Sequence, residues 1–215
     1  MKALVYCGEQ SVRQVDVDAP VIASPDVSVR VLQAGICGTD IGAVRYGRPV
    51  LAPRMTLGHE FVGRREDTGQ LVVGNPLLSC GVCRNCRDGR MHLCEKRVVI
   101  GVHRPGAFAE TVAWPTSHLV DAGTATLAQA AMSDPIATAL HAFHLADKPQ
   151  GPVAVLGAGA IGLSMLFVLK SLGVQDVTVT DISRERLDLA LAAGADRVDT
   201  AISGVFDVVY DTAGT

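Results

Sequence analysis

Aromatic side chains are scarce in this chain, since phenylalanine, tryptophan and tyrosine together make up 4% of its 215 residues. The hydrophobic core is therefore expected to be built from aliphatic side chains. The chain also lacks an excess of positive charge, because its formal net charge is −3 at pH 7. Proteins that bind nucleic acid usually carry a basic patch, so the charge argues against a nucleic-acid partner.

No segment has the pattern of a signal peptide, because the apolar residues at the N-terminus are few and lead directly into polar ones. The most apolar stretch, "VAVLGAGAIGLSMLFVLKSLG" from Val153, is about as long as a membrane span. Its glycines and Lys170 favour a buried strand, turn and helix instead. The sequence therefore predicts a cytoplasmic protein without a membrane segment, in which thiols stay reduced.

One short stretch, "CGVCRNCRDGRMHLC", holds most of the cysteines: Cys80, Cys83, Cys86 and Cys94. Four thiolates at short spacing suit a tetrahedral zinc ion, which would leave no coordination position open. An iron–sulfur cluster and a redox C-x-x-C pair are alternatives, and a reducing compartment disfavours a disulfide knot. The stretch thus predicts a structural metal site that stiffens a lobe.

The first two thirds of the chain are rich in valine and isoleucine, interrupted by glycine, proline and aspartate at short spacing. Such runs are typical of β-strands joined by tight turns. The expected strand regions are 2–7, 27–37, 60–67, 70–74 and 107–114. They predict a β-barrel-like or partly open sheet domain over residues 1–148.

After Gly151 the pattern alternates between strand and helix periodicity. Strands are expected near 153–156, 176–180 and 207–210, with a weaker one near 197–199 and helices between them. This alternation predicts a doubly wound parallel sheet over residues 149–215. Because the dinucleotide-binding form of this sheet has about six strands, we expect the chain to hold the N-terminal portion of a longer domain.

The turn "VAVLGAGAIG" places Gly157, Gly159 and Gly162 after an apolar strand and at the start of a helix. In a dinucleotide-binding turn the first glycine bends the chain, the second lets a pyrophosphate approach and the third lets helix and strand pack closely. Asp181 follows Gly157 by 24 residues, where a carboxylate accepts hydrogen bonds from the adenosine ribose and repels a 2′-phosphate. The sequence favours NAD over NADP, although two arginines follow closely.

Two further motifs, "GICGTD" and "GHE", carry residues that bind zinc in proteins. Cys37 lies in the first motif and His59 in the second, and both side-chain types are common zinc ligands. Taken singly, each has a structural interpretation, because cysteine is among the most often buried residues. Together with the cysteine stretch and the glycine turn, they make the purely structural interpretation of each residue less favoured.

The order of these motifs resembles that of the medium-chain zinc-dependent alcohol and polyol dehydrogenases. GICGTD comes first, GHE with Gly63 following comes second, the four-cysteine stretch third, and GAGAIG with its distal acid last. The resemblance covers nearly the whole chain. It implies a GroES-like β-barrel catalytic domain followed by a Rossmann doubly wound parallel sheet, with a catalytic zinc ion in the cleft between them.

The resemblance implies that Cys37 and His59 are the first two ligands of this catalytic zinc. The third ligand of the family is a cysteine, glutamate or aspartate before the interdomain helix, a position that corresponds to Asp134 in "AAMSDPIATALHAF". A carboxylate oxygen suits zinc. The alternative is that Asp134 caps the helix ahead of Pro135, because aspartate is favoured there.

Further roles follow from the same resemblance. Glu60 corresponds to a mobile carboxylate beside the metal, Asp40 orients His59, and Thr39 takes the proton of the substrate. The implied cofactor-binding residues are Gly157, Gly159, Ile161, Gly162, Asp181, Arg186 at the adenosine ribose and Thr138 at the nicotinamide. At Gly42 many members have a histidine that completes a proton relay, so here the proton must leave through water or the ribose.

The predicted function is a zinc-dependent oxidoreductase that transfers hydride between a secondary alcohol, polyol or amino alcohol and NAD. It requires one catalytic and one structural zinc ion per chain, and the resemblance implies a homodimer or homotetramer at full length. Two alternatives stay open: a zinc-independent NAD(P)H reductase of activated C=C bonds on the same fold, and a non-enzymatic zinc-stabilised binding module. Residues 46–49 and 103–108 are expected to line the substrate pocket.

Overall fold

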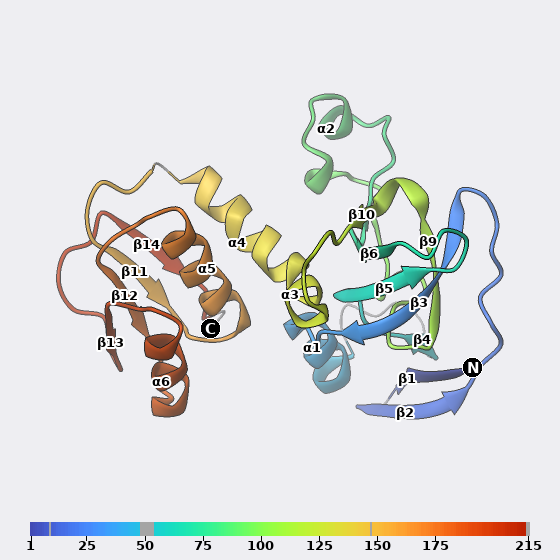
Figure 1. The fold of residues 1–215 in the computed structure, drawn as a ribbon, viewed down its shortest axis with the longest axis horizontal. Helices are drawn as coiled ribbons and strands as arrows, with labels where there is room; N and C mark the ends of the chain where they lie inside the picture. Colours follow the sequence, from blue (N-terminus) through green and yellow to red (C-terminus); the bar gives the residue numbers. More distant parts are fainter. Residues whose placement is uncertain (9, 48–53, 147, 214–215) are drawn as a thin grey trace. The chain divides into compact units, whose positions relative to one another are not determined.

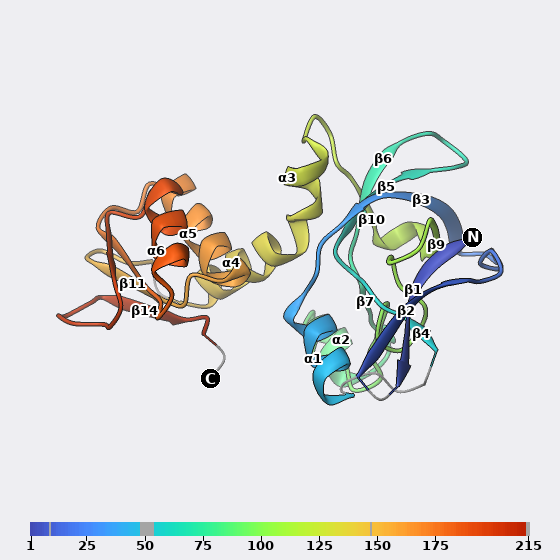
Figure 2. The same cartoon turned by 90° about the horizontal axis from the view of Figure 1, so that it is seen from below.

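The computed structural model describes residues 1–8, 10–47, 54–146 and 148–213, and Figures 1 and 2 show it in two views. The chain divides into two compact units, Met1–Ser133 and Asp134–Thr215. The division falls before the boundary predicted near residue 148, because helix α4 (Ser133–Leu145) contributes Ala139 and Phe143 to the core of the second unit. None of the described helices has the length and apolar character needed to cross a bilayer.

The first unit consists of antiparallel sheets. Its strands are β1 (Lys2–Gly8), β2 (Ser11–Asp16), β3 (Asp26–Ala34), β4 (Met55–Thr56), β5 (Phe61–Arg65), β6 (Leu71–Gly74), β7 (Leu77–Leu78), β8 (Val98–Val99), β9 (Thr111–Pro115) and β10 (Leu119–Asp121). They form a five-stranded sheet of order β10-β6-β5-β3-β9, a three-stranded sheet of order β2-β1-β4, and the pair β7-β8. The short helices are α1 (Gly38–Tyr46), α2 (Arg84–Arg87) and α3 (Leu127–Ala131), with 3-10 turns η1 (Met91–Leu93) and η2 (Thr116–His118).

The core of this unit is mostly aliphatic, as the scarcity of aromatic residues predicts. A large aromatic contact joins Phe61 and Trp114, whose ring centroids lie 4.7 Å apart. Both rings are buried among valines of the five-stranded sheet. Gly74 lies against the same pair, since a Cβ atom there would approach a Trp114 ring atom to 2.5 Å. The lobe that contains α2 extends away from the sheets in Figure 1.

The second unit is an α/β layer structure. Its strands are β11 (Val153–Leu156), β12 (Val177–Thr180), β13 (Arg197–Asp199) and β14 (Val208–Asp211), and α5 (Ala160–Ser171) and α6 (Arg184–Ala192) join α4 as its helices. The strands are parallel in the order β13-β12-β11-β14. Figures 1 and 2 show α5 and α6 along one face of this sheet. The predicted parallel sheet is therefore present, and β12 is buried along its whole length.

Candidate functional site

The motif GICGTD forms the beginning of α1. Cys37 is the residue that caps this helix, and its Sγ accepts a hydrogen bond from the Thr39 N–H at 3.4 Å. Asp40 reaches back, and its carboxylate accepts the Cys37 N–H at 2.9 Å. This reciprocal arrangement is a capping box in which cysteine replaces the usual serine or threonine. The Cys37 sulfur is therefore held at the helix end by local backbone geometry.

Asp40 also connects α1 to the motif GHE. Its Oδ1 accepts the Gly58 N–H at 3.2 Å and lies 4.0 Å from Nδ1 of His59. Asp40 and His59 are both buried. The 4.0 Å separation is longer than a hydrogen bond, so the role of Asp40 in orienting His59 stays a prediction.

Glycine is required at position 58 for two reasons. Its φ is 90°, a conformation that disfavours other residues, and a Cβ atom there would overlap the ring of Phe108. The Gly58 carbonyl oxygen accepts the Ala107 N–H at 2.8 Å. Gly106 packs directly on the same carbonyl group. Part of the predicted pocket-lining segment 103–108 thus supports the backbone beside His59.

The first candidate metal site consists of Cys37, His59 and Glu60, whose potential ligand atoms all lie within 4.8 Å of one another. His59 and Glu60 are buried and Cys37 is half-buried. A sulfur, an imidazole nitrogen and a carboxylate oxygen are the donor types that zinc binds. The residues present in the first unit therefore fit a zinc ion.

Asp134 and Thr138 lie in α4, at the beginning of the second unit. Asp134 is half-buried in the first turn of the helix, and Thr138 is exposed one turn later. Cys37 and His59 belong to the other unit. The assignment of Asp134 as third zinc ligand and of Thr138 as a nicotinamide contact therefore stays a prediction.

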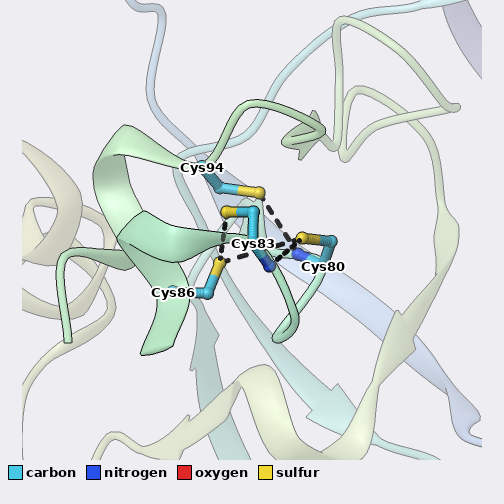
Figure 3. Close-up of side chains that lie close together, drawn as sticks. All are labelled: Cys80, Cys83, Cys86 and Cys94. Carbon is cyan, nitrogen blue, oxygen red and sulfur yellow. Dashed lines mark hydrogen bonds between the residues drawn. The ribbon is translucent and has the colours of Figure 1, made fainter. Parts of the chain in front are cut away.

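The second candidate metal site is the four-cysteine lobe, which includes α2 and η1. Figure 3 shows its four side chains pointing toward one another, and their sulfur atoms all lie within 4.8 Å. Sγ of Cys86 is 3.5 Å from that of Cys83 and 3.9 Å from that of Cys80. Sulfurs at the corners of a tetrahedron around zinc are about 3.8 Å apart, given a Zn–S bond of about 2.3 Å.

These sulfur distances distinguish the alternatives for the lobe. They are far longer than a disulfide bond of about 2.05 Å, and all six cysteines are free thiols. An iron–sulfur cluster binds its cysteines through separate iron atoms, which would space the sulfurs more widely than a single ion does. The lobe therefore fits one zinc ion with four sulfur ligands.

The backbone of the lobe favours the thiolate form of Cys80 and Cys83. Backbone groups of Val82 and Cys83 lower the pKa of Cys80 to about 6, and backbone contacts also lower the pKa of Cys83. Cys86 differs, because loss of contact with water raises the pKa of its thiol to about 11. A bound metal ion deprotonates a coordinating thiol outright, so metal binding would oppose this shift at Cys86.

The glycine turn lies between β11 and α5, as predicted. Gly157 has a φ of 92°, and its N–H donates to the Thr180 carbonyl oxygen at 2.7 Å. Gly159 is the residue that caps α5, and a Cβ atom there would have no heavy atom within 4 Å. Gly162 packs directly on Gly157, whose carbonyl oxygen a Cβ atom would overlap. The first and third glycines thus serve the fold, while the second leaves open space.

Asp181 ties this turn to the end of β12. Its Oδ2 accepts the Ala158 N–H at 2.8 Å and its Oδ1 accepts the Ser183 N–H at 2.9 Å. Arg186 Nη1 lies 3.5 Å from Oδ2. The pKa of the Asp181 carboxyl lies below its ordinary value, chiefly because of the Ser183 N–H, with smaller contributions from Ala158 and Arg186. Asp181 is therefore a fixed negative charge at neutral pH.

These residues line a hollow of about 420 Å³ at the carboxyl ends of the parallel strands. Its walls include Gly157, Gly159, Asp181, Arg186 and Thr212. The strand order reverses direction between β11 and β14, and ligands of such sheets bind in the crevice at this reversal. The hollow therefore lies where a dinucleotide binds in sheets of this kind, and N–H groups at the beginning of a helix such as α5 are of the kind that binds phosphates.

Several other predicted residues are placed as follows. Thr39 is half-buried in the first turn of α1, Gly42 is in the interior of that helix, and Ile161 is in the first turn of α5. Tyr46 is 75% exposed, and residues 48 and 49 lie outside the described residues.

Gly35, which has no role among the sequence-based predictions, lies beside Glu60. No spacing rule identifies it, because the contact depends on how β3 pairs with β5.

Comparison with known proteins identifies similar chains. Residues 23–124 match the family model described as alcohol dehydrogenase GroES-like domain. Over 209 residues the chain is 41% identical to L-threonine 3-dehydrogenase of Streptomyces coelicolor, a match that covers 91% of this chain and 61% of that relative. The chain thus spans less than two thirds of the length of this relative.

Solved structures with the same fold are also known. A protein described as a zinc-binding dehydrogenase from Sinorhizobium meliloti 1021, bound to NADP, is 31% identical with a TM-score of 0.92, covering 100% of this chain and 70% of that chain. Galactitol-1-phosphate dehydrogenase from Escherichia coli is 33% identical with a TM-score of 0.86, covering 92% and 60% respectively. These matches confirm the predicted fold class, a GroES-like β domain followed by a Rossmann-type sheet.

Proposed function

Since this chain belongs to the medium-chain zinc-dependent alcohol and polyol dehydrogenases, we propose that it transfers hydride between an alcohol and NAD. The substrate class is a secondary alcohol, polyol or amino alcohol. L-threonine is the first compound to assay, because the chain is 41% identical to an L-threonine 3-dehydrogenase. The sequence-based predictions of a cytoplasmic homodimer or homotetramer remain part of the proposal.

The grouping of Cys37, His59 and Glu60 within 4.8 Å carries this proposal. A reductase of activated C=C bonds on the same fold has no use for a sulfur, an imidazole and a carboxylate held together. A non-enzymatic zinc module does not require a nucleotide-binding hollow such as the one beside Gly157 and Asp181. The first metal site and the nucleotide hollow together favour the dehydrogenase over both alternatives.

In the proposed mechanism Cys37, His59 and Asp134 would hold the catalytic zinc, and Glu60 would serve as the mobile carboxylate. When bound, the metal acts as a Lewis acid that makes the substrate hydroxyl more acidic. Thr39 accepts the hydroxyl proton and passes it to water or the cofactor ribose, because Gly42 offers no side chain for a relay. Asp40 holds the beginning of α1 and the backbone before His59 in place through its hydrogen bonds. It would thereby keep Cys37 and His59 in the same relative positions.

The second unit supplies the proposed cofactor site. The N–H groups at the beginning of α5 would bind the pyrophosphate, and Gly159 leaves room for its approach. Asp181 accepts hydrogen bonds from the ribose hydroxyls, since a carboxylate has more acceptor sites than its two N–H partners occupy. Thr138 would contact the nicotinamide. The reaction depends on positioning of these groups, with the hydride chemistry supplied by the cofactor.

Zinc content tests the two-metal proposal directly. Elemental analysis of the dialysed chain is expected to give about two zinc ions per chain, one for each set of donors. The Cys37→Ser variant is expected to lose one ion, and a variant with serine at Cys80 and Cys83 to lose the other. Asp134→Ala loses the same ion as Cys37→Ser if Asp134 is a ligand. Unchanged zinc content in Cys37→Ser would contradict the assignment of the first site.

Cofactor preference tests the role of Asp181. The Asp181→Ser variant is expected to bind NADH about tenfold more weakly, because hydrogen bonds to a charged group are worth about 1.5–3 kcal/mol. It is expected to bind NADPH more tightly, since the charge that repels a 2′-phosphate is gone and Arg186 is released. Fluorescence titration with both cofactors measures this, and Asp188→Asn, an exposed acid of α6, is the matched control. An unchanged ratio of the two affinities argues against the proposed contact.

A further inference from the structure

We propose that Gly35 is a positioning residue for Glu60 and, through it, for the first metal site; the proposal rests on the function proposed above. Gly35 directly follows β3, and its N–H donates to the Glu60 carbonyl oxygen at 2.8 Å. This bond continues the antiparallel pairing of Ala34 with Phe61 between β3 and β5. Strand pairing therefore places Gly35 and Glu60 side by side.

The missing side chain of Gly35 leaves the space that Glu60 occupies. A Cβ atom at position 35 would lie 2.6 Å from Glu60 Oε2 and 3.3 Å from Glu60 Cβ, and its three nearest atoms all belong to Glu60. Non-bonded heavy atoms prefer separations of about 3.5–4.0 Å, so the carboxylate would have to move. Glu60 is only 8% exposed, which means that the displaced carboxylate must find a new position among packed neighbours.

Backbone conformation does not account for this glycine. Gly58 and Gly157 have φ values of 90° and 92°, whereas Gly35 is absent from the described glycines with positive φ. An alanine at position 35 is therefore compatible with the local backbone. The cost of the substitution therefore comes from the contact with Glu60 and not from backbone strain.

The position of this carboxylate matters because its oxygen is grouped with the potential ligand atoms of Cys37 and His59. A glutamate displaced by a methyl group no longer presents its oxygen at the same place beside them. Losing a side chain that supports a metal site typically costs about 10–100-fold in metal affinity. We therefore expect Gly35→Ala to change the metal site while leaving the fold of the first unit in place.

The first test observes the carboxylate without any metal. The side-chain carboxyl ¹³C resonance of Glu60, assigned through its loss in Glu60→Gln, is recorded in the metal-free chain at fixed pH. Gly35→Ala is expected to shift this resonance. The control is Gly38→Ala, because Gly38 has no positive φ and no heavy atom within 4 Å of a Cβ atom there. A resonance that stays unchanged in Gly35→Ala overturns the proposal.

The second test measures affinity for Co²⁺, which takes the place of zinc and absorbs visible light. The signal of the first site is the part of the spectrum that Cys37→Ser abolishes. Gly35→Ala is expected to weaken Co²⁺ binding there by about tenfold, Gly38→Ala to leave it unchanged, and Gly35→Ala to have no further effect in a Glu60→Ala background. Equal weakening with and without the Glu60 side chain overturns the proposal, because Gly35 would then act by another route.

The two tests separate this proposal from the proposed function. If the wild-type chain shows no Co²⁺ signal that depends on Cys37, the metal site proposed above is wrong. The resonance of Glu60 then decides alone whether Gly35 positions the carboxylate. If Glu60→Ala fails to fold, the resonance shift and the single-variant affinity of Gly35→Ala, compared with Gly38→Ala, still support or overturn the proposal.

Discussion

Replacing Cys37 by serine is expected to lower the rate of alcohol oxidation by about 10³-fold or more in any preparation that turns over with NAD. A Lewis-acid metal is worth several kcal/mol in such a reaction, and each 1.4 kcal/mol is about a factor of ten in rate. Serine is itself a preferred helix-capping residue, so the capping box between position 37 and Asp40 is retained. The substitution therefore removes a metal ligand while keeping the beginning of α1.

Two measurements make this result specific. NADH affinity is expected to stay unchanged, because the glycine turn and Asp181 belong to the second unit. Cys7→Ser is the matched control, since Cys7 is an exposed thiol of β1 that belongs to neither candidate metal site. Activity that survives in Cys37→Ser, together with a full loss of one zinc ion, would show that the metal at this site is not used in the reaction.

The parallel sheet of the second unit could be predicted closely from the sequence. Strands expected at 153–156, 176–180 and 207–210 are observed at Val153–Leu156, Val177–Thr180 and Val208–Asp211. Central parallel strands are covered on both faces and therefore appear as continuous apolar runs, as "VAVL" does. The weaker strand at 197–199 is also present, at the sheet edge where fewer apolar residues are needed.

Strand β2 (Ser11–Asp16) shows what the sequence does not reveal. It was not among the predicted strands, and its "SVRQVD" is mostly exposed. It pairs with β1 on one side only, at the edge of a three-stranded sheet. An edge strand held mainly by backbone hydrogen bonds needs no apolar alternation, so its pattern resembles that of a polar loop.

The two candidate metal sites also differ in how far the sequence alone predicts them. Spacing alone predicts the cysteine lobe, because a single short segment supplies every sulfur, and the structure groups Cys80, Cys83, Cys86 and Cys94. Cys37 and His59 come from segments joined only by tertiary structure, and their pairing was suggested by resemblance. The contact of Asp40 with Gly58 and that of Gly35 with Glu60 depend on side-chain placement and strand register, which no spacing expresses.

Substitution of Gly162 by alanine is expected to destabilise the second unit by about 3 kcal/mol, at the upper end of what overpacking costs. A Cβ atom there would overlap the Gly157 carbonyl oxygen and lie 2.9 Å from Thr212 Oγ1. The clash involves backbone, so a rotamer change cannot relieve it. Urea denaturation followed by far-UV circular dichroism measures the loss, and cofactor binding is expected to disappear with it because the turn is displaced.

Gly159→Ala is the variant to compare with Gly162→Ala, because it is expected to affect cofactor binding and not the fold. Position 159 has an extended backbone and no heavy atom within 4 Å of a Cβ atom, so the variant is expected to lose at most about 1 kcal/mol, the cost of a poorer helix cap. NADH binding is nevertheless expected to fall by at least about tenfold, because the new methyl group occupies the space that a pyrophosphate needs to approach the turn. A folded Gly159→Ala variant that binds NADH normally would show that the phosphates do not bind at this turn. Equal destabilisation by both substitutions would mean that Gly159, like Gly162, is needed for the fold.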